Sequence, residues 1–275
     1  MNIKILFISP NGTTKTTAAL LTEAFTKNNH HVDCINIGKS PYREDPQLIL
    51  EEIISADVVG FGSAAYHMDL MEPMIQLFSL IQANHSRFHF RAFFFINYSG
   101  ITTGKAFLLY ARKFHSMGIQ VCGAMKIIAP HFHHKMDFPT ERTYKTIEDF
   151  TTSLEEKEFA RMSVQQIENE LQPFTRKTHI IYPLIHLIGK KRELTITIDQ
   201  QICKQCGKCA RECPAGAISQ NGSIHIDFNK CLHCYHCVTA CPQKAIHSPI
   251  NKLDSMMQTN IKIIGMEQPG DQYYV

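Results

Sequence analysis

The sequence predicts an α/β protein in which a doubly wound, five-stranded parallel sheet is followed by a small α+β unit rich in cysteine. Two observations lead to this prediction. Apolar runs typical of buried strands alternate five times with segments of helical periodicity in the first 171 residues. Eight of the ten cysteines then fall between Cys203 and Cys241. A chain of 275 residues is long enough for one large domain or two smaller ones, and this division favours two.

The elements of the first unit follow from apolar runs and helical spacing. Strands are predicted at residues 2–9, 30–37, 56–64, 91–99 and 119–127. Helices are predicted at 16–28, 46–55, 72–82 and 104–118, and segment 140–171 is expected to form one long helix or two shorter ones. Regular alternation of strands and helices predicts a parallel sheet with helices on both faces.

Charge changes along the chain at about the same point as cysteine content. Residues 1–170 hold 16 Lys and Arg against 18 Asp and Glu, a balance of −2, whereas residues 171–275 hold 12 against 7, a balance of +5. We therefore expect a sheet domain, a linker, a cysteine-rich domain and a C-terminal tail of unassigned role, at residues 1–171, 172–194, 195–248 and 249–275.

The cysteines follow the pattern C-x-x-C-x-x-C-x-x-x-C-P twice, with an offset of 28 residues. The similarity extends to the flanking segments, since TITID and SIHID precede the two runs and PAGAIS and PQKAIH follow them. This duplication predicts two copies of a short strand, a ligand loop and a short helix. Proline is tolerated in the first turn of a helix, so we expect each helix to open at the proline of its motif.

The pattern resembles that of the bacterial-type two-cluster ferredoxins, over about residues 195–248. The resemblance implies that the fourth cysteine of each run ligates the cluster of the other run. One 4Fe-4S cluster would then be held by Cys203, Cys206, Cys209 and Cys241, and the second by Cys231, Cys234, Cys237 and Cys213. Two alternatives are zinc sites, which also use C-x-x-C pairs, and a relic that holds no cluster.

Two such clusters would also account for the basic C-terminal part. Each four-thiolate cluster carries roughly two negative charges when oxidised. Two of them would nearly cancel the balance of +5, without an acidic partner, and the cations near the motifs are Lys204, Lys208, Arg211 and Lys230.

A loop of small hydroxyl residues, within ILFISPNGTTKTTA at 5–18, joins the first predicted strand to the first helix. Backbone N–H groups at a helix N-terminus attract anions, and hydroxyl groups there can add hydrogen bonds. The loop is therefore a candidate phosphate site. The alternative is an ordinary helix cap, for which Ser and Thr are also preferred.

The same loop resembles the flavodoxin signature F-x-S-x-x-G-x-T-x-x-x-A, which is matched by Phe7, Ser9, Gly12, Thr14 and Ala18. The resemblance implies strand order 2-1-3-4-5 and an FMN phosphate held by Ser9, Asn11, Gly12, Thr13 and Thr14. It also implies that the loops after the third and fourth strands flank the flavin ring. The candidates there are Ser63, Ala64, Ala65, Tyr66, Asn97, Tyr98, Ser99 and Gly100. The chain has no tryptophan, so ring stacking would depend on tyrosine or on backbone contacts.

Together the two halves resemble the fused flavodoxin–ferredoxin proteins of anaerobic bacteria and archaea. This implies an electron-transfer protein that passes electrons between FMN and two 4Fe-4S clusters, to or from a redox protein or a small-molecule donor or acceptor. One alternative is a flavin-dependent reductase of a small organic substrate bound near Tyr66 and the histidines of 131–134. The other is a redox-sensing or docking module whose flavodoxin fold holds no flavin. No residue pattern identifies a catalytic acid, base or nucleophile.

The remaining features favour a cytoplasmic protein without a membrane span. The formal net charge of +3 is too small to favour a nucleic-acid partner. No apolar stretch reaches the roughly 18 residues that a spanning helix needs, and the N-terminus lacks the features of a signal peptide. The apolar segment 179–189 is expected to pack between the domains, and 131–134 to form a solvated loop. Cys34 and Cys122 are expected to be small core residues.

Overall fold

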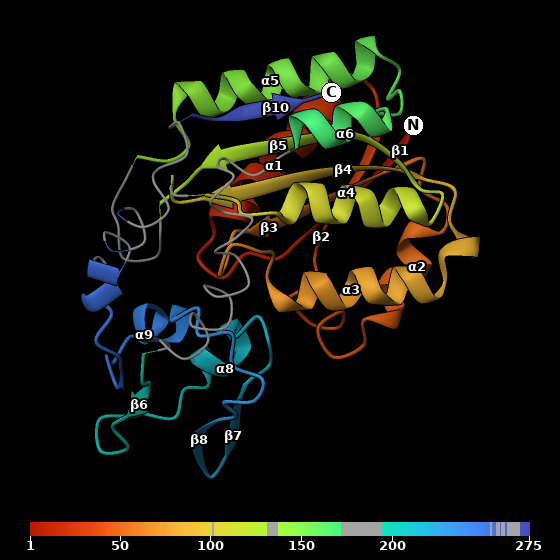
Figure 1. Ribbon diagram of the computed structural model, residues 1–275. Coiled ribbons are helices and arrows are strands. Elements are labelled where there is room, and N and C mark those ends of the chain that lie inside the picture. The colour runs from red at the N-terminus through yellow and green to blue at the C-terminus, as the bar shows by residue number, and fades with distance from the viewer. Residues whose placement is uncertain are drawn as a thin grey trace.

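In a computed structural model, the chain forms a six-stranded sheet covered by helices, with a smaller cysteine-rich unit beside it (Figure 1). The structure describes residues 1–100, 102–130, 137–171, 194–253, 255, 256, 259, 262 and 270–275. The predictions made for segments 131–134 and 179–189 lie outside the described residues, as does nearly all of the predicted linker at 172–194.

Five strands of the sheet are parallel, and they form where the apolar runs predict them. They are β1 (Asn2–Phe7), β2 (His31–Asn36), β3 (Val58–Ala64), β4 (Arg91–Tyr98) and β5 (Gln120–Ile128). Neighbours along the sheet run in the order β5-β4-β3-β1-β2. This confirms the predicted flavodoxin-like order 2-1-3-4-5, in which the strand order reverses between β1 and β3.

A sixth strand, β10 (Gln272–Tyr274), pairs antiparallel with β5 and places Tyr273 opposite Met125. The backbone N–H of Ile128 also donates to Oδ1 of Asp271, at 2.8 Å. The sequence predicts five strands for this unit and no structure for the C-terminal tail. Three residues are too few to show a strand pattern, so only the tertiary structure reveals that this segment covers the edge of β5.

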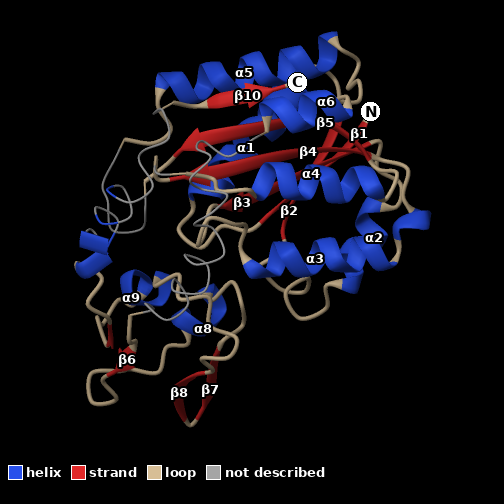
Figure 2. Cartoon of the chain, in the orientation of Figure 1, coloured by secondary structure: helices blue, strands red, loops and turns tan. Residues whose placement is uncertain are grey.

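Helices cover both faces of the sheet (Figure 2). One face carries α1 (Thr13–Lys27) and α5 (Glu141–Glu156), whose apolar residues share a core with β1 and β4. The larger core on the other face involves the remaining helices of this unit, α2 (Gln47–Ile53), α3 (Glu72–Ala83), α4 (Ala106–Ser116) and α6 (Val164–Glu170). A 3-10 turn, η1 (His85–Arg87), leads into β4.

Segment 140–171 forms two helices, and both of their starts are explained by the sequence. Thr140 and Ser163 each accept a hydrogen bond from the backbone N–H three residues on, and each pair closes a capping box. Such boxes satisfy N–H groups that a helix start leaves without partners. The chain therefore turns between α5 and α6, which places α6 beside α4 on the opposite face.

The two cysteines of the sheet unit lie in different environments. Cys122, on β5, is fully buried, as predicted for a core residue. The corresponding prediction for Cys34 is wrong, because its side chain is exposed on β2. β2 is an edge strand of the sheet, so its alternating residues are less covered than those of the central strands.

The cysteine-rich unit contains two short antiparallel pairs. β6 (Thr197–Ile198) pairs with β9 (Ile246–His247), and β7 (Ile218–Asn221) pairs with β8 (Ser223–Ile226). The first pair joins the start of one sequence repeat to the end of the other. The halves of the duplication are therefore interlocked rather than placed side by side as separate units.

Two short helices of this unit, α8 (Lys208–Glu212) and α9 (His236–Ala240), contradict the predicted helix positions. Each helix begins one residue before the third cysteine of its motif, contains that cysteine, and ends before the fourth cysteine and the proline. The residue that precedes a proline is driven out of the helical region, and Cys213 is indeed extended, with φ −66° and ψ 115°. The prolines therefore end these helices instead of opening them.

The cysteine-rich unit lies on the side of the sheet at which the parallel strands end (Figure 1). Open α/β sheets bind ligands at this edge, beyond the carboxyl ends of their strands. Among the described residues, no helix is long and apolar enough to cross a membrane.

Candidate cofactor sites

The eight clustered cysteines divide between two cavities. We call the first the distal cavity, and the cysteines that line it are Cys203, Cys206, Cys209 and Cys241. We call the second the proximal cavity, and its cysteines are Cys213, Cys231, Cys234 and Cys237. Each cavity thus receives three cysteines from one motif and the fourth from the other. This grouping agrees with the ligand sets that the ferredoxin resemblance implies.

The pKa values of the thiols reflect this grouping. Burial, together with negative charge on Cys213 and Cys231, raises the pKa of Cys234 to about 12. Burial likewise raises the pKa of Cys209, and its charged neighbours are Cys241 and Cys203. Buried thiolates this close repel one another, so they would ionise together only with cations among them. A cluster of iron ions meets that requirement.

Backbone N–H groups point at equivalent sulfur atoms in the two motifs. The N–H of Ala217 donates to Sγ of Cys213, and the N–H of Ala245 donates to Sγ of Cys241, both at 3.3 Å. Hydrogen bonds to ligand sulfurs are one of the means by which a protein sets the reduction potential of an iron–sulfur cluster. The donors therefore suit thiolates that hold a redox cluster.

The loops that carry the cysteines are shaped by left-handed residues between them. Gln205 and His233 occupy equivalent positions and have φ of 52° and 48°. Gly207 and Tyr235 form the next equivalent pair, with φ of 68° and 55°. A positive φ is unusual for a tyrosine, and Tyr235 is buried with its hydroxyl accepting a hydrogen bond from the N–H of Leu194 at 2.8 Å. The surroundings thus hold the loop in a shape that turns its cysteines inward.

The candidate phosphate loop caps α1 with its own side chains. Oγ of Ser9 accepts from the N–H of Lys15 at 3.0 Å, and Oδ1 of Asn11 accepts from the hydroxyl of Thr13 at 2.9 Å. Nδ2 of Asn11 donates to the carbonyl of Pro130 at 3.1 Å. These contacts fit the helix-cap interpretation and use part of the hydrogen-bonding capacity of the loop.

One hydroxyl of the loop is not used in this way. Oγ1 of Thr14 is buried and has no hydrogen-bond partner, which is uncommon for a buried polar atom. Gly12, just before the helix, has φ 92°, and no atom lies within 4 Å of the position that a Cβ would occupy. An unsatisfied donor and an open glycine at a helix N-terminus fit the binding of a phosphate group.

An open cavity of about 670 Å³ begins at this loop. Its walls include Ser9, Asn11, Gly12 and Lys15 on one side. On the other side they include Lys39 from the loop after β2 and three residues of the cysteine-rich unit, Glu212, Pro214 and His236. The cavity therefore lies between the candidate phosphate loop and helices α8 and α9 of the cysteine-rich unit.

The loops predicted to flank a flavin ring are packed within the protein. Ser63 is buried at the end of β3 and accepts a hydrogen bond from the N–H of Met71 at 3.1 Å. A Cβ on Gly104 would lie 1.9 Å from the carbonyl oxygen of Met68, so the loops after β3 and β4 touch. They would have to separate to admit a ring between them.

The ring candidates of β4 and the loop after it are largely buried. The hydroxyl of Tyr98 donates to the carbonyl of Gly270 at 3.3 Å, and Nδ2 of Asn97 donates to Oγ1 of Thr17 at 2.9 Å. Ser99 is half-buried and Gly100 is buried with φ 83°. None of the ring candidates lines the 670 Å³ cavity. The described geometry therefore fits the phosphate of FMN better than it fits the ring.

Three residues make contacts between the units that the sequence does not predict. Lys39 and Arg43 follow β2, and both contact the end of α8. Tyr66 was predicted as a flavin contact, but its hydroxyl donates to the carbonyl of His233 in the cysteine-rich unit. No motif marks the first two, and their partners lie more than 160 residues away in the sequence.

Comparisons with known proteins distinguish the two units. Residues 189–246 match the family model of the 4Fe-4S dicluster domain. No similar protein was found among curated sequences. The chain is similar to rubredoxin oxygen:oxidoreductase from Desulfovibrio gigas, at 18% identity and a TM-score of 0.46, over 58% of this chain and 37% of that one. The chain thus spans little more than a third of the length of that protein.

Two flavodoxins give comparable values. An archaeal flavodoxin is 22% identical, with a TM-score of 0.44, over 57% of this chain and 98% of its own. Flavodoxin 1 from Bacillus cereus is 14% identical, with a TM-score of 0.42, over 57% and 98%. The strand order itself defines the fold of the first unit. The chain joins a doubly wound sheet of flavodoxin-like order to a C-terminal 4Fe-4S ferredoxin-like region.

Proposed function

We propose that the chain is an electron-transfer protein that holds two 4Fe-4S clusters and exchanges electrons with a redox partner. The observation that carries this proposal is the division of eight cysteines into two cavities, each lined by four of them. Four thiolates around one cavity are the ligand set of a cubane cluster, and each such cluster carries one electron at a time. The ligands would be Cys203, Cys206, Cys209 and Cys241 in the distal cavity and Cys213, Cys231, Cys234 and Cys237 in the proximal one.

We further propose that the sheet unit binds FMN, with the phosphate at Ser9, Asn11, Gly12, Thr13 and Thr14. The buried, unpartnered hydroxyl of Thr14 supports this, as does the open side of Gly12. A flavin would supply exchange between two-electron and one-electron chemistry. Protein groups in this loop would orient its phosphate and contribute no covalent step.

We also propose that residues 1–171 and 195–248 act as the two functional domains, joined by 172–194. Strand β10, from the proposed tail, belongs to the sheet. Thiolate ligands persist in reducing compartments, so we propose a cytoplasmic protein.

One observation favours a second candidate function, a redox-sensing or docking module without flavin. The contact between Met68 and Gly104 closes the space between the two loops that would flank a ring. In that case the sheet unit would serve as a docking platform for the clusters. This candidate retains the clusters and differs only in the absence of a flavin.

An anaerobic rapid-mixing experiment separates a carrier from a reductase. The purified chain would be reduced with a low-potential chemical donor and mixed with a one-electron acceptor or with small organic compounds. A carrier is expected to give fast reoxidation by the one-electron acceptor and no sustained consumption of organic compounds. Many turnovers with an organic compound would contradict the carrier proposal. Cys122→Ser is the control variant, because Cys122 lies outside both cysteine cavities and the 670 Å³ cavity, and Cys241→Ser is expected to remove part of the reoxidation signal.

A further inference from the structure

The two cysteine cavities are not equivalent in their relation to the sheet unit. Leu232 and Cys234, which line the proximal cavity, pack against the larger core of the sheet unit together with Tyr66. Among the described residues, none that lines the distal cavity hydrogen-bonds to the sheet unit. The proximal cavity therefore lies at the interface between the units, and the distal cavity lies away from it.

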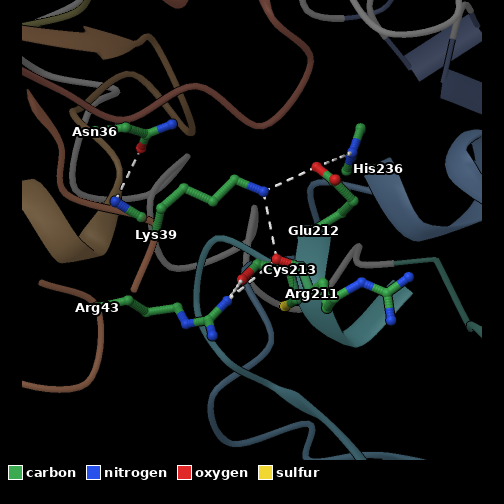
Figure 3. Close-up of polar contacts among 8 residues, drawn as sticks. Asn36, Lys39, Arg43, Arg211, Glu212, Cys213 and His236 are labelled. Atoms are coloured by element: carbon green, nitrogen blue, oxygen red, sulfur yellow. Dashed lines mark hydrogen bonds and ion pairs between the residues drawn. The ribbon is translucent and has the colours of Figure 1, made fainter. Parts of the chain in front are cut away.

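Two cations of the loop between β2 and α2 reach across this interface (Figure 3). Nη1 of Arg43 donates to the carbonyl oxygen of Cys213 at 2.8 Å. Nζ of Lys39 donates to Oε2 of Glu212 at 2.8 Å and to the carbonyl of Arg211 at 3.3 Å. The last carbonyls of a helix have no hydrogen-bond partner within the helix, so these two cations supply donors for the carbonyls at the end of α8.

The carboxylate of Glu212 is shared between the units. It pairs with Lys39, and Nε2 of His236, at the start of α9, lies 4.0 Å from the same oxygen. Figure 3 shows Glu212 between these two side chains. The helices that end at Cys213 and Cys241 are thereby connected to one anchor on the sheet unit.

Shape as well as charge determines how the units meet. Gly38 is buried, and a Cβ there would lie 3.1 Å from Cβ of Pro214, which follows the cluster cysteine Cys213. Such a contact is tighter than ordinary van der Waals contact, so a larger side chain at Gly38 would push Pro214 away. The backbone of Gly38 is not left-handed, so a substitution there adds bulk without backbone strain.

Arg43 is well placed to act on the electrostatics of the proximal cavity. Its side chain is only 17% exposed, so solvent screens its charge weakly. Its Nε and Nη2 atoms bond Glu44, whereas Nη1 faces Cys213. A cation beside an anionic cluster favours the reduced form, which carries one more negative charge.

We propose that Arg43 and Lys39 are positioning residues that seat the proximal cavity against the sheet unit, and that Arg43 raises the reduction potential of the cluster bound there. This inference rests on the proposed cluster ligands and goes beyond the proposed function, because it makes the two clusters unequal. The cluster nearer to the sheet unit is tuned by a residue of that unit. The distal cluster lacks this influence and is the one left to meet an external partner.

The test is a potentiometric titration of the full chain, followed by electron paramagnetic resonance. Arg43→Gln is expected to shift one of the two cluster potentials to a more negative value and to leave the other unchanged. Arg87→Gln is the matched control. Arg87 pairs with Glu51 on the surface of the sheet unit, and its substitution removes the same charge as Arg43→Gln. Arg43→Lys, which keeps the charge, is expected to retain most of the wild-type potential.

Gly38→Leu tests positioning without a change in charge. This variant and Lys39→Met are expected to speed amide hydrogen exchange in residues 211–216, while segment 203–206 of the distal motif exchanges as in the wild type. Unchanged potentials in Arg43→Gln, or an equal shift of both, would overturn the electrostatic inference. Unchanged exchange in both other variants would overturn the positioning inference. Failure of the proposed function would look different from failure of this inference. A wild-type chain that binds no clusters would show no redox transition in the titration. The hydrogen-exchange experiment would still test whether Lys39 and Gly38 position the cysteine-rich unit.

Discussion

The hydroxyl of Tyr66, in the loop after β3, donates a hydrogen bond to the main-chain carbonyl of His233, one residue before Cys234 of the proximal cavity. The two residues are 167 positions apart in the sequence, and the bond crosses between the units. His233 is buried and left-handed, with φ 48°. The loop predicted to flank a flavin ring is thus in direct contact with a cysteine loop of the cysteine-rich unit.

Removing this hydroxyl should weaken the contact between the units. Tyr66→Phe removes the hydroxyl that donates to the carbonyl of His233, and the loss of such a part-buried hydrogen bond costs about 1 kcal/mol of stability. Chemical denaturation of the full chain measures the loss. Tyr144→Phe is the matched control, because Tyr144 is 52% exposed on α5, and its stability should equal that of the wild type. Equal stability of both variants would show that the bond contributes nothing.

If the fourth cysteine of each motif ligates the cluster of the other motif, its substitution should damage that other cluster. Cys241→Ser should damage the cluster whose other ligands lie in the first motif, although Cys241 belongs to the second motif. We expect loss of roughly half of the iron, with the second cluster retained. Iron analysis and the resonance spectrum of the reduced protein measure this. If Cys241→Ser and Cys237→Ser removed the same spectral component, the crossed assignment would be wrong.

The unpartnered hydroxyl of Thr14 predicts opposite effects on stability and on binding. Valine has nearly the same shape, so Thr14→Val should leave the unliganded chain as stable as the wild type or more stable. Loss of a hydrogen bond to a charged phosphate should weaken FMN binding by roughly tenfold or more. Isothermal calorimetry and thermal unfolding measure the two quantities.

Thr151→Val is the control for this experiment. Thr151 is buried on α5, and its hydroxyl donates to the carbonyl of Ile147 at 3.0 Å. Its replacement should not alter FMN binding. An unaltered affinity in Thr14→Val would place the phosphate elsewhere.

Asp271 should make stability depend on pH in the acid range. Burial raises the pKa of its carboxyl above the ordinary value of 3.8, so the folded chain keeps this proton to a higher pH than the unfolded chain does. The contribution of this group to stability is therefore greatest below pH 3.8 and declines as the pH rises through the raised pKa.

Two substitutions of Asp271 separate its charge from its hydrogen bond. Asp271→Asn keeps an acceptor for the N–H of Ile128, so it should remove this decline and be at least as stable as the wild type at neutral pH. Asp271→Ala loses the acceptor and should be less stable than Asp271→Asn. Urea unfolding between pH 3 and pH 7 compares the three proteins. If the stability of Asp271→Asn declined with rising pH in parallel with that of the wild type, another group would be responsible for the decline.

Local patterns predicted most of the sheet unit. The five parallel strands and their order were predicted, because long apolar runs and a single matching loop contain that information. β10 was not predicted, since its three residues gain their structure only from the open edge of β5. Cys34 was wrongly placed in the core, because an alternating run does not tell which strand will be at the edge.

The grouping of cysteines was predicted from the duplicated motif, and the two cavities agree with it. The predicted helix positions in that unit were wrong. A helix was expected to begin at each motif proline, whereas α8 ends before Pro214 and α9 ends before Pro242. The contacts of Lys39 and Arg43 could not be predicted from sequence. They depend on how two separately patterned units meet, and neither residue belongs to a motif.

The most direct test of the central claim is to purify the chain without oxygen and to measure iron, sulfide and flavin together with the visible spectrum. The proposed function predicts about eight irons, an equal amount of acid-labile sulfide, and one FMN per chain. A chain with about eight irons and no flavin would contradict the FMN part and favour the docking module. A chain without iron and sulfide would contradict the proposed electron-transfer function itself.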